Sequence, residues 1–416
     1  MYIDGIKLKN FRTFKDVEVK FVHPDVDFSA VGFPKPRLAN LNLLLGDNGY
    51  GKTTLLKAIA LAALGPAVRS SGIYAYRLVR RGPEHLRGSK KLRGSAGAKD
   101  ARIDATFTPH PQDDAGTHTK LESSVRVSRR GDLEELQWAH REEKRWHPIF
   151  SADSEALFFV GYGTSRRVEK REQVDLGSRR SSVFARAQRV QSLFEEAHSL
   201  VPLSVWLPGQ NKGRFTQVRN LINLMLGPGQ YHFAGELERG EYLFERKGLT
   251  VPFPALSDGY RAFLGWVGDL LYHVCTTCPT GKKLTENRGM VLVDEIDLHL
   301  HPRWQLHVLP TLAAALPNIQ FIVTSHSPLI VGSLEWMNIL VMKPGPDQSA
   351  DVQRIRSAIH GLDADQVLVT EFFGLESTRA ESKQRQLKEL TLKARDGDAT
   401  AAKALLEEMS RGVEEV

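Results

Sequence analysis

The chain has 416 residues, of which 41% are hydrophobic and 25% charged, the composition of a globular protein large enough for two lobes. No apolar run is long enough to span a bilayer, residues 1–6 lack a signal-peptide pattern, and two cysteines give no disulfide framework, so we expect a cytoplasmic protein without a membrane partner. The net charge of +7 suits nucleic acid as a partner without requiring it.

In chain order, the first predicted elements are a β-hairpin and a phosphate-binding loop. Residues 2–8 and 16–22 alternate apolar and polar side chains around a turn at 10–14. The apolar run 41–45 predicts a buried strand, and residues 54–64 predict a helix that stops at Gly65-Pro66. The string Gly46-Asp47-Asn48-Gly49-Tyr50-Gly51-Lys52-Thr53 stands between them. It has the G-x-x-x-x-G-K-T pattern of a P-loop, with the strand and the helix that this motif requires.

This loop predicts a site for ATP and Mg²⁺. Its glycines let backbone N–H groups surround a phosphate, and the helix N-terminus adds partial positive charge. Lys52 is expected to reach the β- and γ-phosphates, and the Thr53 hydroxyl is expected to bind Mg²⁺. The predicted ATP-binding residues of the loop are Gly46, Asp47, Asn48, Gly49, Tyr50, Gly51, Lys52, Thr53 and Thr54.

The positive charge is concentrated in two stretches. Residues 77–102 hold nine Lys or Arg residues against two acidic ones and are rich in Gly and Ser, which predicts a loop. The second cluster consists of Arg166, Arg167, Lys170, Arg171, Arg179, Arg180, Arg186 and Arg189. Either contact with DNA phosphates or a solvated surface would account for these clusters.

The middle of the chain predicts strands first and helices later. Strands are expected where apolar and polar residues alternate or where a short apolar run occurs, and helices where the apolar period is 3.6. The predicted elements are strands at 101–108, 119–128, 132–139 and 157–160, a helical region at 182–226 broken near 202–213, a hairpin at 241–253, a long helix at 260–275, and two charged helices at 380–412.

Two further apolar runs end in polar residues. The strand Met290–Val293 is followed by Asp294 and Glu295, the pattern of a Walker B motif. Asp294 is expected to hold Mg²⁺ through water, and Glu295 to act as the general base on the attacking water. The strand 321–325 is followed by His326, which we expect near the γ-phosphate. Glu295 and His326 are therefore the predicted catalytic residues.

The string Leu256-Ser257-Asp258-Gly259 before the long helix resembles the signature motif of the ABC ATPase superfamily. The resemblance implies that Ser257, Asp258 and Gly259 complete the ATP site of a second subunit, so that two heads enclose two ATP molecules. A helix N-terminus with a hydroxyl is a suitable site for an anion. Asp258 stands where the family usually has Gly, and it either adds charge near the phosphate or caps the helix.

The start of the chain resembles the branch that contains the SMC, RecF and OLD-type ATPases. The resemblance rests on Ile6-Lys7-Leu8-Lys9-Asn10-Phe11-Arg12-Thr13-Phe14 and makes Arg12 a candidate nucleotide contact, the alternative being a solvated side chain. Tyr162-Gly163-x-x-Arg166 resembles stand-alone prokaryotic defence ATPases, and Leu298–Pro302 resembles the D-loop of the same branch. The glutamine that this superfamily places beside the metal is not identified, and Gln173 stays unassigned.

Residues 354–379 resemble the tail of the Septu and retron-associated defence ATPases, which act beside an HNH nuclease encoded nearby. The resemblance implies an ATPase that dimerises around ATP and regulates such a nuclease, with no nuclease activity of its own. A RecF-like DNA clamp is the alternative, and a transporter subunit would need the missing glutamine loop. The Cys275-x-x-Cys278 pair lacks the second pair that a zinc site would need.

The expected fold is an α/β ABC-ATPase head with a P-loop mixed-sheet core, an antiparallel β subdomain in the first lobe, a helical insertion and a helical C-terminal tail. The predicted divisions are residues 1–180 for the first lobe, 181–240 for the helical insertion, 241–345 for the signature, Walker B and histidine part, and 346–416 for a tail that serves assembly or partner binding.

Overall fold

The computed structural model describes residues 1–81, 98–109, 120–139, 144–146, 158–168, 185–227, 231–345, 347 and 349–410. Its contacts divide the chain into two units, residues 1–361 and 362–416. The boundary falls later than the predicted start of the tail at residue 346, because the strand 350–353 still pairs with the central sheet of the first unit. No helix among these residues is both long and apolar enough to cross a membrane.

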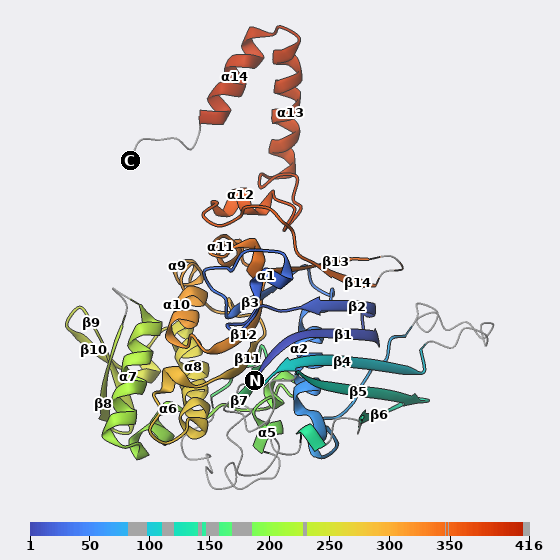
Figure 1. The fold of residues 1–416 in the computed structure, drawn as a ribbon. Coiled ribbons are helices and arrows are strands. Elements are labelled where there is room, and N and C mark those ends of the chain that lie inside the picture. The colour runs from blue at the N-terminus through green and yellow to red at the C-terminus, as the bar shows by residue number, and fades with distance from the viewer. Residues whose placement is uncertain are drawn as a thin grey trace. The chain divides into compact units, whose positions relative to one another are not determined.

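A mixed six-stranded sheet forms the centre of the first unit (Figure 1). Its strands, in spatial order, are β14 (Ala350–Gln353), β13 (Ile339–Pro344), β3 (Leu41–Leu45), β12 (Ile319–Ser325), β11 (Gly289–Val293) and β7 (Phe158–Tyr162). All neighbours are parallel except β14 and β13. Every residue of β3, β7, β11 and β12 is buried, as expected for parallel strands covered on both faces. The mixed-sheet core is confirmed.

The second sheet is antiparallel and begins with the N-terminal hairpin. Its strands, in spatial order, are β2 (Phe14–Lys20), β1 (Tyr2–Phe11), β4 (Asp100–Thr108), β5 (Leu121–Arg130) and β6 (Leu133–Trp138). Helix α2 (Lys52–Leu64) packs against β4 and β5 of this sheet and against β12 of the central sheet. All its residues except Thr53 and Lys57 are buried, so the helix that leaves the P-loop lies in the main core.

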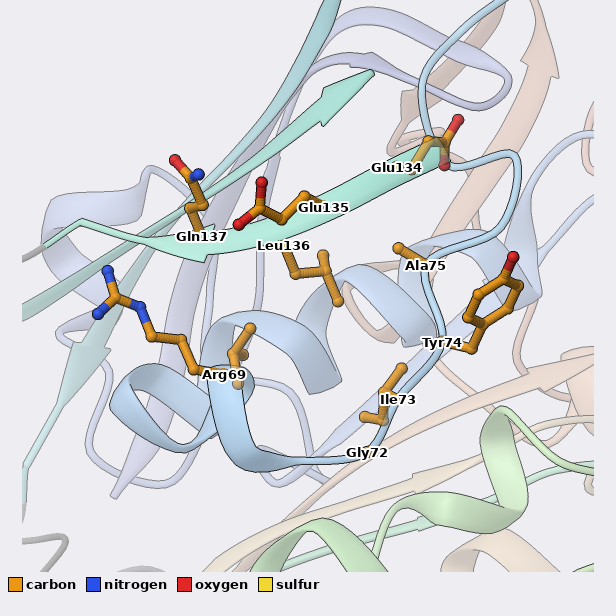
Figure 2. A pocket seen from close by; sticks show the side chains of 10 residues that line it. Arg69, Gly72, Ile73, Tyr74, Ala75, Glu134, Glu135, Leu136 and Gln137 are labelled. Carbon is orange, nitrogen blue, oxygen red and sulfur yellow. The ribbon is translucent and has the colours of Figure 1, made fainter. Parts of the chain in front are cut away.

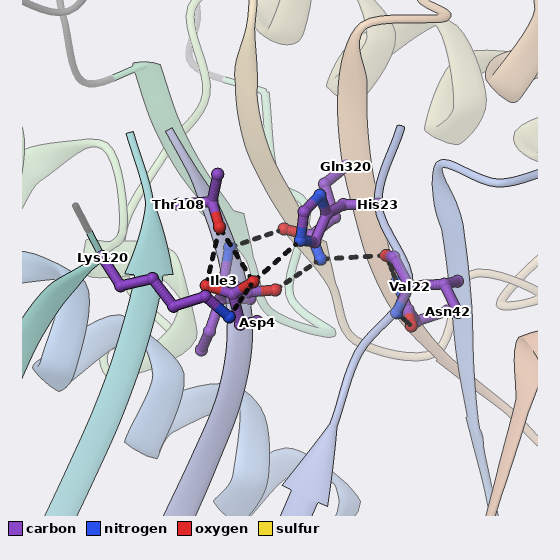
Figure 3. Close-up of polar contacts among 8 residues, drawn as sticks. All are labelled: Ile3, Asp4, Val22, His23, Asn42, Thr108, Lys120 and Gln320. Atoms are coloured by element: carbon purple, nitrogen blue, oxygen red, sulfur yellow. Dashed lines mark hydrogen bonds and ion pairs between the residues drawn. The ribbon is translucent and has the colours of Figure 1, made fainter. Parts of the chain in front are cut away.

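Amide side chains join the N-terminal hairpin to the central sheet (Figure 3). Gln320 of β12 accepts from the N–H of Ile3 at 2.9 Å and donates to the carbonyls of Ile3 and Val22 at 2.9 and 3.0 Å. Asn42 of β3 accepts from the N–H of Val22 at 2.8 Å and donates to its carbonyl at 2.7 Å. Buried amides must be hydrogen-bonded to be tolerated, so these contacts fix where the hairpin sits beside β3 and its loop.

The same figure shows a polar group on the outer side of β1. Asp4 contacts His23 at 3.1 Å, and it accepts from the Thr108 hydroxyl at 2.8 and 2.9 Å and from Lys120 at 3.4 Å. Burial alone would raise the pKa of Asp4, but the hydrogen bonds and charges of these neighbours outweigh burial and hold the pKa below its usual range. The group links β1, β4 and the segment after β2.

The remaining part of the first unit is mostly helical and differs from the prediction in two places. The predicted helical region 182–226 is mainly short turns, α5 (Ala185–Gln188), η5 (Gln191–Leu193), α6 (Leu203–Trp206) and η6 (Leu207–Gly209), before the 15-residue α7 (Lys212–Leu226). A strand that the sequence did not predict, β8 (His232–Glu238), extends the expected hairpin of β9 (Glu241–Arg246) and β10 (Leu249–Pro252) into a three-stranded sheet.

Four further helices follow the three-stranded sheet in the described part of the chain, of which only the first is long. They are α8 (Asp258–Thr277), α9 (Pro302–Gln305), α10 (Val308–Ala315) and α11 (Pro328–Gly332). The other short helices and turns of this unit are α1 (Phe28–Val31), η1 (Gly65–Ser70), η7 (Phe253–Ala255), η8 (Leu284–Glu286) and η9 (Trp336–Asn338). Helix α8 contains the long helix that the sequence predicted at 260–275 and begins within the signature motif (Leu256–Gly259).

The second unit contains α12 (Ala364–Leu368), α13 (Glu381–Arg395) and α14 (Ala399–Ser410). The two predicted charged helices are therefore confirmed, with their turn at Asp396–Asp398. They pack against each other, and Lys383 of α13 forms an ion pair with Glu408 of α14. This hairpin of helices is a separate compact body in the chain.

Candidate functional site

Three parallel strands bring the predicted site residues to one edge of the central sheet. β12 lies between β3 and β11, with Ser325 beside Leu45 and Val323 beside Val293. The P-loop follows β3, Asp294 follows β11 and His326 follows β12. Because the carboxyl ends of neighbouring parallel strands meet at the same edge, side chains separated by more than 240 positions come together there.

The P-loop has the backbone conformation that requires glycine. Gly49 and Gly51 have φ angles of 89° and 93°, in the left-handed region. A Cβ on Gly51 would lie 2.5 Å from the Thr13 hydroxyl and 2.9 Å from the Phe14 ring, so the hairpin turn closes directly against the loop. Asp47, Asn48 and Gly49 are exposed, while Gly46 and Tyr50 are half-buried and Thr54 is buried in α2.

Lys52 lies inside this loop. Its Nζ donates to the carbonyls of Gly46 at 2.6 Å and Asp47 at 3.1 Å. Burial lowers the pKa of Lys52, and the nearby carboxylates of Asp294 and Glu295 act in the opposite direction. An ammonium group in a glycine-rich loop that leads into a helix N-terminus is a suitable partner for a polyphosphate.

Thr53 and Asp294 join the loop to the second strand. The Thr53 hydroxyl donates to Oδ2 of Asp294 at 2.7 Å, and the Thr324 hydroxyl donates to Oδ1 at 2.7 Å. Hydroxyl and carboxylate oxygens are the ligands that Mg²⁺ prefers, alone or through water. The oxygens that the sequence predicted as metal ligands are therefore adjacent, and their chemistry fits the ion.

Glu295 has an unusual backbone conformation, with φ of 47°. A left-handed conformation costs a residue with a Cβ about 1–2 kcal/mol, so it must be held by its surroundings. Its N–H donates to the Thr324 hydroxyl at 2.7 Å, and the next N–H, of Ile296, donates to the Thr324 carbonyl at 2.9 Å. We call residues 294–296 the acid turn. Thr324, which the sequence did not single out, orders this turn from the side of β12.

His326 lies beside the same charged groups. Burial and the charge of Lys52 lower the pKa of His326, against the opposing charges of Asp297, Glu295 and Asp47, which favours the neutral ring. Its Nε2 is buried and has no hydrogen-bond partner among the described residues. Oδ1 of Asp297 has none there either. Such buried orphan atoms are rare in proteins and fit a site that a polar ligand completes.

The signature motif lies elsewhere on the first unit. Ser257 and Asp258 are exposed, and Ser257 is the N-cap residue of α8. Within the described residues, no hydrogen bond or ion pair joins either of them to the P-loop. Asp258 is the first residue of α8 rather than its N-cap, and it forms an ion pair with Arg261 one turn later.

Gly259 of the signature motif touches the segment after the acid turn. A Cβ on Gly259 would lie 2.6 Å from the carbonyl oxygen of His299, whose φ is 65°. The following residue, Tyr260, packs edge-on against Trp304 with ring centroids 4.5 Å apart. We call residues 296–304 the D-loop segment. His301 in this segment accepts from the N–H of Arg303 at 3.2 Å as the N-cap of α9.

The structure places Arg12 in the turn between β1 and β2, and it describes only part of the two basic clusters. Arg12 has a φ of 47°, its guanidinium donates to the carbonyl of Tyr76 at 3.4 Å, and its Nε is buried without a hydrogen bond in the described part of the chain. Residues 82–97 of the first cluster lie outside the described residues, as do Lys170, Arg171, Arg179, Arg180 and Gln173.

The hydrogen bonds of Arg166 were missed by the sequence reasoning. Its side chain is half-buried and donates to the carbonyls of Gly163, Asp294 and Glu295. Neither alternative given for its cluster, contact with DNA phosphates or a solvated surface, describes Arg166, because these donors are used inside the protein. The sequence feature that could have pointed to a role inside the site was the position of Arg166 in the Tyr162-Gly163-x-x-Arg166 string.

Two other features do not form part of this site. A hollow with a volume of about 550 Å³ lies between residues 68–75 and β6. Figure 2 shows the side chains that line it. Its Glu134 accepts from the N–H groups of Leu78 at 2.6 Å and Val79 at 3.3 Å. Burial raises the pKa of Cys275 to about 12, which keeps this thiol protonated, and no group of three metal-ligating side chains occurs in the part of the chain that the structure describes.

A family model described as "AAA domain, putative AbiEii toxin, Type IV TA system" matches residues 41–332, and one described as "AAA ATPase domain" matches residues 1–63. The first match covers well over half of the chain. It includes the P-loop, the signature motif, the acid turn and His326.

Curated relatives match over different parts of the chain. The Septu protein PtuA of Bacillus mycoides is 23% identical over 379 residues, which cover 91% of this chain and 45% of that protein. The Escherichia coli protein named "Retron Ec83 probable ATPase" is 34% identical over 119 residues, 29% of this chain and 22% of that protein. A RecF protein of Acetivibrio thermocellus is 39% identical over 71 residues, 17% of this chain and 15% of its own. The chain spans less than half the length of each.

Among solved structures, an SMC head bound to the C-terminal winged-helix domain of ScpA aligns with a TM-score of 0.47 and 19% identity, covering 85% of this chain and 98% of that one. The SMC head domain from Thermotoga maritima aligns with a TM-score of 0.47 and 14% identity, covering 86% and 100%.

Proposed function

This chain belongs to the AAA domain family whose model it matches, and on that premise we propose that it binds ATP with Mg²⁺, hydrolyses it, and dimerises around it to control a partner nuclease in anti-phage defence. The observation that supports hydrolysis most strongly is one series of hydrogen bonds, from Thr53 through Asp294 and Thr324 to the N–H of Glu295. It connects the phosphate-binding loop to the proposed base.

Each residue of the site has a role in this proposal. The P-loop N–H groups and Lys52 bind the β- and γ-phosphates, which holds the γ-phosphorus in place for attack. Thr53 and Asp294 hold Mg²⁺, which supplies positive charge at the phosphate oxygens. Glu295 orients a water molecule and accepts its proton, and neutral His326 donates an Nε2 hydrogen bond to the γ-phosphate. Arg12 contacts the nucleotide from the hairpin turn.

Dimerisation is proposed from the separate position of the signature motif. Ser257 and Asp258 at the start of α8 are exposed, and the N-terminus of a helix is a suitable contact for a phosphate held by another subunit. A dimer in which each signature motif faces the partner's P-loop would use both surfaces. The hairpin of helices in residues 362–416 is proposed as the surface for assembly or partner binding.

The defence role rests on the long match to Septu PtuA and the shorter match to a retron ATPase. We propose an HNH-type nuclease as the partner, DNA as a ligand of the basic clusters, and no nuclease activity in this chain. The short match to RecF favours a second candidate, a DNA clamp for repair. Strong stimulation of the ATPase by DNA alone, with no nuclease recovered from the native host, would support the clamp instead.

The proposed hydrolysis is tested with Glu295→Gln. Removing the base should slow ATP hydrolysis at least about 100-fold, while the affinity for a fluorescent ATP analogue stays unchanged. Glu238→Gln, an exposed glutamate of β8, is the matched control and should behave like the wild type. Turnover near the wild-type rate in Glu295→Gln would contradict the assignment. The same slow variant should form dimers with saturating ATP in light scattering, and a monomer there would contradict the dimer.

A further inference from the structure

Arg166 donates hydrogen bonds to three backbone carbonyls, two of which belong to the acid turn (residues 294–296). Its Nη2 donates to the carbonyl oxygens of Asp294 and, at 2.7 Å, Glu295, and its Nε donates to the carbonyl of Gly163 at 3.2 Å. Burial lowers the pKa of Arg166 to about 10, with the charges of Asp294, Asp297 and Glu295 opposing that effect. The guanidinium therefore remains charged at neutral pH, and its donors serve the backbone rather than a carboxylate.

Arg166 binds carbonyl groups of the acid turn, whereas Thr324 binds its N–H groups. The Thr324 hydroxyl accepts from the N–H of Glu295. Arg166 donates to the carbonyl of Asp294 and to the carbonyl of Glu295 itself, which belong to the two peptide groups that flank the Cα of Glu295. The peptide groups on both sides of Glu295 are thus fixed while its φ is 47°. Since the direction of a side chain follows from its backbone, the two neighbours together set where the Glu295 carboxylate points.

The guanidinium plane is itself fixed by aromatic packing. Arg166 lies 5.7 Å from the ring centroid of Trp266 in α8. The Tyr162 ring packs 5.7 Å from the same Trp266 ring, and the Tyr162 hydroxyl donates to buried Asp269 of α8 at 2.8 Å. A planar guanidinium with several directed donors, placed beside an aromatic ring, cannot be replaced by the single charge of a lysine without loss of geometry.

We infer that Arg166 is a positioning residue that holds Glu295 in the orientation needed for hydrolysis. The inference rests on the proposed function, in which Glu295 is the base. Arg166 contacts the acid turn through backbone carbonyls, so its removal should lower the rate of the chemical step and leave ATP affinity nearly unchanged. An interaction that acts only through Glu295 should also lose its effect once Glu295 can no longer accept a proton.

The test is a double-mutant cycle in the full chain. Arg166→Met should lower kcat about 100-fold, with ATP affinity within about threefold of the wild type. Arg166→Lys should give an intermediate loss of about 10-fold. Arg130→Met, at an exposed arginine of β5 outside both basic clusters, is the control. In the Glu295→Gln background, Arg166→Met should slow hydrolysis by less than about threefold further.

The outcomes separate the inference from the proposed function. If Glu295→Gln is slow but both Arg166 variants turn over at the wild-type rate, the inference is wrong and the function stands. The inference would also be wrong if the fold losses in hydrolysis rate of the two single variants multiplied in the double variant, because Arg166 would then act independently of Glu295. If Arg166→Met does not fold, the cycle is run with Arg166→Lys. Normal turnover of Glu295→Gln itself would remove the proposed base and the inference together.

Discussion

Replacing Asp269 by Asn is predicted to destabilise the first unit without changing the ATP site directly. Asp269 is a buried carboxylate in α8. It accepts from the Tyr162 hydroxyl of β7 at 2.8 Å and from the N–H of Val201 at 2.8 Å, and it lies 3.3 Å from Nε2 of His273. The Asp269 side chain therefore joins three parts of the first unit: the edge strand β7, the segment before α6, and its own helix α8.

The size of the effect follows from these contacts. Asn can keep the acceptor for Val201 but loses the charged oxygen that faces Tyr162 and His273. A hydrogen bond to a charged group contributes about 1.5–3 kcal/mol, and partial re-pairing of the amide recovers some of it, so we expect a net loss of about 2–3 kcal/mol. A domain of this size loses about 2 °C of melting temperature per kcal/mol, which gives a decrease of about 4–6 °C.

The loss should depend on pH in a defined direction. Burial would raise the pKa of Asp269, but the charge of His273 and the hydrogen bonds from His273, Val201 and Tyr162 outweigh burial and hold the pKa below its ordinary value. A carboxylate with a lowered folded-state pKa contributes stability above its unfolded value of about 3.9 and loses that contribution as the pH falls through the folded value. The difference between wild type and variant should therefore be full at pH 7 and narrow below about pH 4.

The assay is thermal unfolding followed by intrinsic fluorescence across this pH range, because the six tryptophans report on folding. Asp132→Asn, at an exposed turn, is the control and should leave the melting temperature unchanged. A melting temperature of Asp269→Asn within about 1 °C of the wild type at neutral pH would refute the reasoning, because a buried carboxylate with three partners cannot be neutralised at no cost.

Two further predictions concern the P-loop and the metal. Gly51→Ala should reduce ATP affinity by more than about 10-fold in a fluorescent-nucleotide titration, because its φ of 93° and the 2.5 Å approach to the Thr13 hydroxyl leave no room for a Cβ; affinity equal to the wild type would contradict the described loop geometry. Removing Mg²⁺ with EDTA should abolish hydrolysis, and adding Mg²⁺ back should restore it, since Thr53 and Asp294 present only oxygen ligands; full activity in EDTA would exclude the proposed metal role.

Much of the fold was predictable because its signals are local. The apolar runs 41–45, 290–293 and 319–323 are each followed by polar residues, and strands with that pattern meet at one edge of a parallel sheet. The helical region 182–226 was overestimated. Its apolar spacing is suitable for a helix, but Pro202, Pro208 and Gly209 interrupt it, and the remaining pieces are too short for long helices.

The residues that order the site were harder to predict. Thr324 stands within an apolar strand, and only the register between β11 and β12 places its hydroxyl between Asp294 and Glu295. Arg166 was counted as surface charge, because a sequence does not reveal which arginines have their donors used by backbone carbonyls inside the fold. For Asp258 the sequence left open a charge near the phosphate or a helix cap, and it did not indicate the ion pair with Arg261 that the structure shows.

The contact between Gly259 and the carbonyl of His299 has a consequence for mutational tolerance. The first turn of a helix usually accepts many residue types, and alanine is usually the safest of them. At position 259 even a methyl group would push α8 away from the D-loop segment. In a saturation library at this position, only glycine should therefore be recovered in folded protein. The two residues before it are exposed, so folding should tolerate many replacements there. In the proposed dimer, the missing side chain of Gly259 would set how closely the signature motif and the D-loop segment of one chain can approach each other.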